Sequence, residues 1–299
     1  MATAAVQAKS RAIIRRNRRT AYLFLAPNFI GFLIFTLIPV LFAVVLSFNR
    51  WDGNNPMQFV GFRNFTRLFS DSNFRISLIN TVIYTVGTVP LIMVIALGLS
   101  MLINSGVRGA PVYRALHFFP HISSIIAISA VWQFLYHPTM GPINKFLMAL
   151  GISNPPGWLS STRWALIAVM IMIVWKSVGY YMISYLAGLQ AIPRELYEAA
   201  TIDGANKWKR FLHVTLPGLK PINFYVAIIC IINSFQVFTP IYVMTRGGPG
   251  RATRVLVYTI YQEAFEEFNF GYASAMSMVL FLCIFIVTVI QFKTQNQGE

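Results

Sequence analysis

The sequence is poor in charged residues. Only 11% of its 299 residues are Asp, Glu, Lys or Arg, whereas a soluble domain usually has about 25%. Hydrophobic residues make up 56% of the chain, and nearly charge-free runs of about 20 residues recur, the length that an α-helix needs to cross a bilayer. The composition therefore predicts an all-α polytopic membrane protein and excludes a soluble domain built around one core.

Motifs for catalysis are also missing. The sequence contains neither the G-x-x-x-x-G-K-[ST] phosphate loop nor the metal-binding H-E-x-x-H motif. The histidines are not paired with acids or cysteines at ligand spacing; they are His117, His121, His137 and His213. We therefore expect no enzymatic activity, no metal and no cofactor in this chain.

Cysteine is scarce as well. Cys230 and Cys283 both fall in apolar runs, where a cysteine typically acts as a small buried hydrophobe. A disulfide between two membrane helices is the alternative, but no spacing pattern supports it.

Six membrane spans are predicted, at about residues 21–48, 77–104, 115–135, 164–188, 219–245 and 273–292. The predicted loop at 49–76 suits a hairpin or helix on the outer surface, and the proline- and glycine-rich loop at 136–163 is expected to be irregular.

Lys and Arg gather in the basic N-terminal tail and in alternate loops, which favours a cytoplasmic location for both termini. This bias also explains the net charge of +15, because no basic, aromatic-rich domain for nucleic acid lies outside the spans.

Acidic residues are absent from the predicted spans, although ion-coupled carriers commonly place an ionisable group there. Lys176, in "VWKSVGYYM", is the only charged residue in the middle of a span. Burying it alone would cost at least ~2.5–3.5 kcal/mol, so we expect it to face a cavity, a group of carbonyl oxygens or another subunit. The sequence leaves open whether Lys176 belongs to a substrate path or is a structural lysine.

A polar segment, "YEAATIDGANKWKRFLHVTLP" from Tyr197 to Pro217, lies between the fourth and fifth spans. Pro193 suits the first turn of a helix, Gly204 suits a left-handed end, and Asn206 suits the N-cap of a second helix. The segment therefore predicts two short cytoplasmic helices. Their aromatic residues favour a docking element over a solvated linker.

This segment also carries a family resemblance. Glu198, Ala199, Ala200, Gly204 and the closing "VTLP" resemble the E-A-A-x3-G-x9-I-x-L-P signature of binding-protein-dependent ABC importer permeases, with Val214 in place of isoleucine. The stretches "LFLAPNFIGFLIFTLIPV", "AGLQAIPRELYEAA" and "SFQVFTPIYVMTRGGPG" resemble the maltose-, oligosaccharide- and glycerol-phosphate-type branch. The resemblance covers essentially the whole chain.

The resemblance implies a type I ABC importer permease core with a cytoplasmic coupling helix, in a bacterial or archaeal plasma membrane. A tail at 1–20 would precede a permease domain at 21–292, with the coupling segment at about 190–217 and a second tail at 293–299. The implied partners are a second, related permease subunit, two cytosolic ATPase subunits that bind ATP and Mg, and an extracellular binding protein. Carried over residue by residue, coupling to the ATPase falls to Glu198, Ala199, Ala200, Gly204, Leu216 and Pro217.

The resemblance further places sugar contacts in the fifth span. Asn233, Gln236 and Thr239 lie at i, i+3 and i+6 and roughly share a helix face. The other candidates for the substrate path are Tyr242 on the same span and Trp175, Lys176, Tyr180 and Tyr181 on the fourth span. The alternative is that Asn and Gln join helices by hydrogen bonds, worth ~0.6 kcal/mol on average.

The substrate expected from this branch is a carbohydrate, most simply a neutral oligosaccharide. Lys176, Arg246, Arg251 and Arg254 leave room for an acidic sugar or a sugar phosphate. The arginines also suit an acidic face of the binding protein. The alternative function is a self-sufficient ion-coupled carrier or channel.

Overall fold

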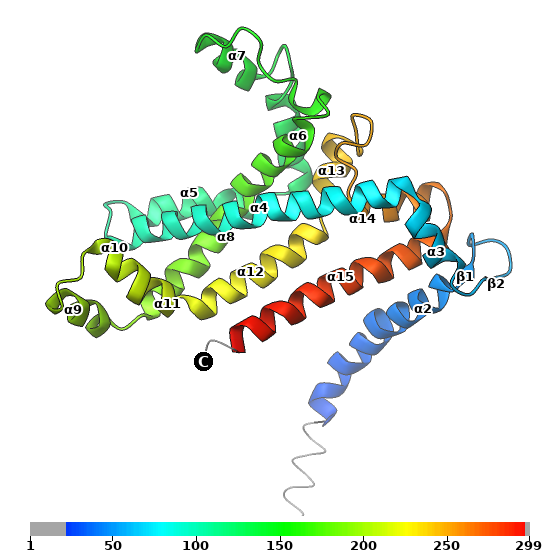
Figure 1. Cartoon of the computed structure of the whole chain (residues 1–299), viewed down its shortest axis with the longest axis horizontal. Coiled ribbons are helices and arrows are strands. Elements are labelled where there is room, and N and C mark those ends of the chain that lie inside the picture. The colour runs from blue at the N-terminus through cyan, green and yellow to red at the C-terminus, as the bar shows by residue number, and fades with distance from the viewer. Residues whose placement is uncertain (1–21, 297–299) are drawn as a thin grey trace, which may run out of the picture.

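A computed structural model describes residues 22–296 as a bundle of long helices with short helices at both ends (Figure 1). The predicted tail at 1–20 and the last residues of the predicted tail at 293–299 lie outside the described residues. Residues 22–32 are helical and continue into the first labelled element. The elements are η1 (Leu33–Leu37), α2 (Ile38–Ser47), β1 (Asn49–Arg50), β2 (Gln58–Phe59), α3 (Arg63–Ser70), α4 (Ser72–Asn104), α5 (Ala110–Ile122), α6 (Ile125–Leu135), α7 (Pro142–Ala149), η2 (Trp158–Ser160), α8 (Ala165–Ala191), α9 (Arg194–Ile202), α10 (Lys207–Arg210), η3 (Phe211–Thr215), α11 (Leu216–Gly218), α12 (Lys220–Phe235), α13 (Thr239–Met244), α14 (Leu256–Tyr261), η4 (Gln262–Glu266) and α15 (Phe270–Asn296).

Five stretches of the described chain are long and apolar enough to cross a membrane. They are Tyr22–Ser47, Ser72–Asn104, Ala165–Ala191, Lys220–Met244 and Phe270–Gln295. A sixth span is present if the bent pair α5 and α6 is counted as one. The helical architecture agrees with the prediction, and the predicted number of six is reached only with this bent pair.

The third predicted span, 115–135, is wrong as a continuous helix. Its two halves, α5 and α6, meet at 98°. Pro120 near the end of α5 lacks an amide hydrogen, and the next two connecting residues, Ser123 and Ser124, have extended ψ angles of 149° and 126°. The Ser123 hydroxyl donates to the Phe119 carbonyl at 3.0 Å, so a side chain satisfies one carbonyl that the break leaves free.

The fifth predicted span, 219–245, is interrupted as well. Helix α12 ends at Phe235, and a new helix, α13, starts only at Thr239. The cause lies in Pro240, because a proline disfavours helical backbone at the preceding residue and clashes with the carbonyl four residues before it, here Gln236.

The second span begins earlier than predicted. The Asp71 carboxylate caps α4 by accepting hydrogen bonds from the amides of Asn73 at 2.7 Å and Phe74 at 3.4 Å. An aspartate at this position satisfies amides that have no partner within the helix. The polar first turn of α4 is therefore helical although it is too polar to be recognised as part of an apolar run.

The two longer loops have local structure. The loop at 49–76 forms the antiparallel hairpin β1–β2 and the helix α3, as predicted. The loop at 136–163 was predicted to be irregular, which is wrong in part because it contains α7 and η2. Asn144 holds this loop together: it accepts a hydrogen bond from Trp158 Nε1 at 2.6 Å and donates to the Pro138 carbonyl at 3.0 Å.

Helix α8 lies at the centre of the bundle and packs against α4, α5 and α12. Three buried apolar clusters follow the bundle: one around Ala96, Tyr185 and Leu219, one around Tyr84, Met172 and Ile241, and one around Leu68, Tyr272 and Met276. By contrast, the span Tyr22–Ser47 leaves most of its apolar side chains exposed, and its second half, α2, packs beside α15.

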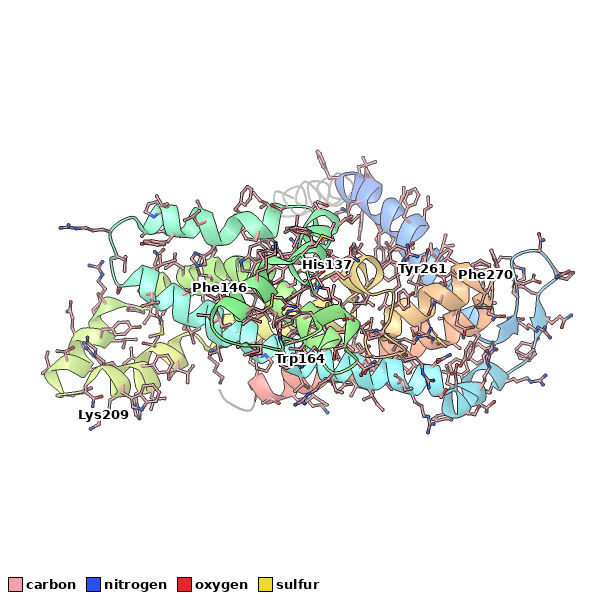
Figure 2. The ribbon with its side chains drawn as sticks, turned by 90° about the horizontal axis from the view of Figure 1, so that it is seen from above. His137, Phe146, Trp164, Lys209, Tyr261 and Phe270 are labelled. Atoms are coloured by element: carbon pink, nitrogen blue, oxygen red, sulfur yellow. The ribbon has the colours of Figure 1, made fainter. Side chains whose placement is uncertain are left out.

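Short helices and the hairpin β1–β2 occupy the two ends of the bundle. Seen from above, Lys209 of α10 lies at one end, and Tyr261 and Phe270 lie toward the other (Figure 2). The end of α15 lies near α11 and the start of α12, on the same side as α9 and α10 (Figure 1). Two of the sites described below lie at these ends, and a third lies inside the bundle between them.

The close packing of α5 on α8 yields a prediction. A Cβ atom on Gly179 of α8 would overlap the His117 carbonyl of α5, so Gly179→Ala should force the helices apart. We expect a loss of about 1–3 kcal/mol in the free energy of unfolding, measured by thermal unfolding of the purified protein in detergent. Gly98→Ala is the control because nothing lies within 4 Å of its added Cβ. Equal stability of the two variants would contradict the packing argument.

Candidate functional site

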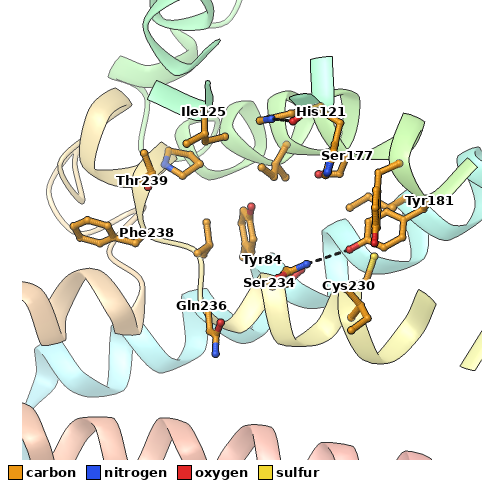
Figure 3. A pocket seen from close by; sticks show the side chains of 18 residues that line it. Tyr84, His121, Ile125, Ser177, Tyr181, Cys230, Ser234, Gln236, Phe238 and Thr239 are labelled. Atoms are coloured by element: carbon orange, nitrogen blue, oxygen red, sulfur yellow. Dashed lines mark hydrogen bonds between the residues drawn. The ribbon is translucent and has the colours of Figure 1, made fainter. Parts of the chain in front are cut away.

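A cavity of about 490 Å³ lies inside the bundle between α4, α8 and the interrupted helix α12–α13 (Figure 3). The end of α5 and the start of α6 close it through His121 and Ile125. Its polar and aromatic lining includes Tyr84, Lys176, Ser177, Tyr180, Tyr181, Asn233, Ser234, Phe238 and Thr239. Polar side chains at membrane depth are costly and commonly mark a substrate path.

The break in α12 forms one wall of this cavity. Gln236, Val237 and Phe238 connect the two helices and all line the cavity. Non-helical backbone at membrane depth is tolerated where it borders a cavity, because polar groups there need not face lipid. The proposed shared face of Asn233, Gln236 and Thr239 is therefore wrong as a helix face, although all three residues line the same cavity.

Gln236 has a different orientation from its neighbours. Its side chain points away from the other labelled groups and toward α15 (Figure 3). It also borders a second hollow with Ser277, Leu280 and Phe281 of α15. Of the three predicted polar residues, Asn233 and Thr239 thus have the more direct relation to the cavity.

Hydrogen bonds join the neighbouring helices that form the cavity walls. Asn233 Nδ2 donates to the Tyr181 hydroxyl at 3.3 Å (Figure 3), which joins α12 to α8. The hydroxyls of Thr88 and Ser234 lie 3.3 Å apart and join α4 to α12. These bonds between helices are the structural alternative that the sequence left open, and they place the polar groups at the cavity wall.

Lys176 fills a structural position and also borders the cavity. It is only 8% exposed, and its Nζ donates to the carbonyls of Pro120 at 3.0 Å, His121 at 2.8 Å and Ser123 at 3.1 Å. These carbonyls end α5, where the backbone has no further helical partner. A cation at a helix C-terminus is favourable, so Lys176 stabilises the break between α5 and α6.

One residue of the cavity wall, His121, was not predicted from the sequence. Its ring stacks on Tyr180 with centroids 4.6 Å apart and an interplanar angle of 17°. The one feature of the sequence that could have indicated it is Pro120. This proline lies near the end of α5, where the chain turns and forms part of the cavity wall. The chemistry of His121 itself was not predictable from its spacing.

Two predicted path residues do not line this cavity. Trp175 borders a separate apolar cavity between α4, α5 and α8 and packs on Trp132 at 5.5 Å. Tyr242 stacks on Phe238 at 5.4 Å and contacts Tyr261 at 5.4 Å. Trp175 is excluded from the wall because consecutive helix residues diverge by about 100°, so Lys176 points inward while Trp175 points elsewhere.

The polar segment after α8 forms the two predicted helices, α9 and α10. Pro193 is the N-cap of α9, one residue before the predicted first turn, and Glu195 lies in that turn. Gly204 has φ of +73°, a left-handed conformation that glycine adopts without strain. The Asn206 side chain accepts a hydrogen bond from the Lys209 amide at 2.8 Å, which confirms the predicted N-cap of α10.

The two helices are tied into one block. The Tyr197 and Thr215 hydroxyls lie 3.0 Å apart, which joins α9 to η3. Arg210 Nη1 donates to the Thr201 hydroxyl at 3.0 Å, which joins α10 to α9. From this block, α11 with Leu216 leads directly into α12.

The outer surface of this block exposes large apolar side chains among its charged residues. Ile202 is 87% exposed and Trp208 is 66% exposed, and Trp208 stacks with Phe211 at 5.5 Å. Glu198 and Ala199 are also exposed. A stable block with large exposed apolar side chains has the character of a docking surface.

The described residues hold no group of three or more His, Cys, Asp or Glu side chains that could bind a metal ion. Both cysteines are free, so the alternative of a disulfide between spans is wrong.

Comparison with known proteins decides the family. Residues 11–293 match the model of the binding-protein-dependent transport system inner membrane component. The chain belongs to this family. It is a multi-pass inner-membrane component of a transport system, and the expectation of a non-catalytic subunit without a cofactor of its own agrees with that membership.

The chain aligns with its relatives over nearly the whole length of both proteins. The chain is 38% identical to the lactose transport system permease protein LacF of Rhizobium radiobacter, over 93% of this chain and 94% of LacF. It is 36% identical to the probable ABC transporter permease protein YesP of Bacillus subtilis, over 96% and 94% of the two chains. It is 34% identical to the arabinooligosaccharides transport system permease protein AraP of Bacillus subtilis, over 99% and 96%.

A solved structure shares the fold. A chain of a bacterial ABC transporter involved in the import of the acidic polysaccharide alginate superposes with a TM-score of 0.82, at 22% identity. The match covers 94% of this chain and 96% of that chain. The overall helical arrangement described above is therefore a known membrane fold.

The role of Lys176 leads to a second prediction. Lys176→Met removes the donor to three carbonyls and leaves them buried, which should lower the free energy of unfolding by about 1–3 kcal/mol. Lys145→Met on the exposed surface of α7 is the control and should leave stability unchanged. Thermal unfolding of both variants in detergent checks this. If the two variants unfold at the same temperature, Lys176 does not hold the break.

Proposed function

We propose that this chain is one of two permease subunits of an ATP-driven importer, and that it moves a carbohydrate, specifically an oligosaccharide, through the cavity between α8 and α12. The observation that carries the proposal is the interrupted helix α12–α13, which borders a polar and aromatic cavity in the middle of the membrane spans. The relatives named for lactose and arabinooligosaccharides support the substrate class.

The cavity suits part of a sugar chain. Its volume of about 490 Å³ falls within the ~300–1,000 Å³ of typical ligand pockets. Asn233 and Thr239 offer hydrogen-bonding groups for hydroxyls, while Tyr180, Tyr181 and Phe238 offer ring faces for C–H contacts. A passage wide enough for more than one sugar unit would lie between this chain and the second permease subunit. We propose that this second subunit is a related but different chain.

The docking block formed by α9 and α10 is the proposed contact with the ATPase. Glu198, Ala199, Ala200 and Gly204 are the proposed coupling positions, with Leu216 and Pro217 at the connection to α12. Because hydrogen bonds join α9, α10 and η3, the block can move as a unit when the ATPase closes. Helix α12 would carry that motion to the break beside the cavity, as in rigid-body switching between two packed states.

The same proposal fixes the orientation in the membrane. The end that bears α9 and α10 faces two cytosolic ATPase subunits, and the end that bears β1, β2 and α3 faces an extracellular binding protein. Residues 21–292 then form the permease domain between two cytoplasmic tails, 1–20 and 293–299. The membrane is the plasma membrane of a bacterium or archaeon.

Charge reversal at the docking block tests the coupling assignment. Glu198→Lys should weaken binding of the ATPase subunits by about 2 kcal/mol or more, roughly thirtyfold, because a like charge would then face a basic group of the partner. The measurement is the amount of ATPase that co-purifies with the tagged permease complex. Glu266→Lys makes the same charge change in η4, between Tyr261 and Phe270 toward the opposite end of the bundle (Figure 2), and should retain the ATPase. Full ATPase retention with Glu198→Lys would remove the coupling assignment.

A pair of asparagines on α12 tests the substrate path. Asn233 lines the cavity, whereas Asn223 of the same helix does not. Asn233→Leu should reduce import of a labelled oligosaccharide into proteoliposomes of the complete complex about tenfold, the effect of losing one hydrogen bond worth ~1.4 kcal/mol.

Asn223→Leu should keep the parent rate, and both variants should retain the ATPase. An equal loss of import in the two variants would show that the cavity has no special part in transport. Normal import by Asn233→Leu would likewise remove Asn233 from the path.

A further inference from the structure

The elements β1, α3 and the start of α15 lie at the end of the bundle opposite to α9 and α10 (Figure 1), and a second polar cavity lies between them. Its volume is about 480 Å³, and β1, α3 and the first turn of α15 form its walls. Three arginines, Arg50, Arg63 and Arg67, line it together with neutral polar side chains. No acidic residue belongs to the lining, so the cavity is positively charged.

The frame of this cavity is fixed by hydrogen bonds. Asn64 of α3 donates through Nδ2 to the carbonyls of Ser47 and Asn49, both at 2.9 Å, and so ties α3 to the end of α2 and to β1. The strand β1 pairs with β2 and also packs against α15. The arginines on β1 and α3 therefore project from a defined scaffold.

One of the arginines is held in place by an aromatic ring. The Arg67 guanidinium lies over the Tyr272 ring of α15, 3.9 Å from its centroid. The Tyr272 hydroxyl donates to Asp71 Oδ2 at 2.7 Å, so the ring is itself fixed. A guanidinium stacked in this way keeps its N–H groups free for hydrogen bonds along its edge.

The neighbouring acids are engaged elsewhere. Asp52 accepts hydrogen bonds from the amides of Asn54 and Asn55, and these bonds lower its pKa to about 2. Asp71 caps α4 and accepts from Tyr272. Glu263 accepts from Asn269 at 3.2 Å, although it is close enough to Arg67 for a charge interaction. Within the described part of the chain, neither Arg50 nor Arg63 forms an ion pair with an acidic residue.

The cavity lies at the depth where the membrane spans end. Ser47 ends one span, Ser72 begins the next and Phe270 begins the last. Exposed aromatic rings occur on β2 and α3 and at the residue before α3: Phe59 is 78% exposed, Phe62 69% and Phe69 83%. Helix α3 thus presents arginine and exposed phenylalanine together, a pattern typical of helices that lie in the membrane interface.

We propose that the cavity of Arg50, Arg63 and Arg67 binds the phosphate headgroup of an anionic phospholipid; its place in the outer leaflet rests on the membrane orientation proposed above. Guanidinium groups match phosphate oxygens in bidentate geometry, and three of them border one hollow at headgroup depth. The exposed phenylalanines beside it contact the acyl chains of the same lipid. A soluble phosphate would make no contact with these rings. The acidic face of a binding protein would also leave the rings exposed in the membrane interface.

A lipid-retention measurement tests the proposal. The complete permease complex is purified in detergent with an equimolar mixture of phosphatidylglycerol and phosphatidylcholine, and retained lipids are counted by native mass spectrometry. The double variant R50Q/R63Q should bind phosphatidylglycerol roughly thirtyfold more weakly with no change for phosphatidylcholine. Arg67 stays unchanged because its stacking on Tyr272 also holds α3.

The double variant K145Q/R163Q is the matched control. It removes the same charge from exposed positions in the α6–α8 connection and should retain phosphatidylglycerol at the parent level. Thermal unfolding of both variants in detergent without added lipid should match the parent, which separates lipid binding from folding.

Three results would overturn the proposal. One is undiminished retention of phosphatidylglycerol by R50Q/R63Q. Another is displacement of the lipid by millimolar inorganic phosphate, which would identify the site as one for a free anion. The third is loss of binding-protein association with lipid retention intact, which would assign the arginines to the binding protein. None of these results bears on the oligosaccharide path.

Discussion

The structure depends on one constraint: a backbone polar group inside a membrane has to find a partner within the protein. Unbroken helices meet this requirement by themselves, whereas the breaks after α5 and α12 do not. At the first break, Lys176 supplies one cation for three carbonyls. At the second, residues 236–238 border a cavity. Helix α8 borders both breaks, because Lys176 lies at the first and Val169 and Met172 belong to the same apolar cluster as Val237 at the second.

This arrangement gives the central helix α8 two connected tasks. The middle of α8 carries Lys176, Tyr180 and Tyr181 at the cavity wall. Its C-terminal end leads through Pro193 into the docking block, from which α11 returns the chain to α12. The cavity wall and the docking block are thus joined by two helices, α8 and α12, that pack against each other. A displacement of the block has a direct mechanical route to the cavity.

The sequence predicted the features that depend on local chemistry. Apolar runs identified the spans, and Gly204 and Asn206 identified the turn between α9 and α10, because left-handed backbone and N-caps select particular residue types. The EAA signature, from Glu198 to Pro217, identified the family. Pro120 and Pro240 carried the signal for both helix breaks, but an apolar run of span length concealed it. Those breaks decided which residues reach the cavity.

Sequence alone therefore determined the class of protein, the apolar runs that form most of the spans, and the two short helices α9 and α10, since composition and short-range spacing specify each of them. Only the tertiary structure decided that Lys176 serves three carbonyls on α5, that His121 stacks on Tyr180, and that Trp175 and Tyr242 stay outside the cavity wall. Each of these facts depends on how separate helices cross after a break. The angle of a break is set by contacts between residues distant in the chain, and no local pattern encodes it.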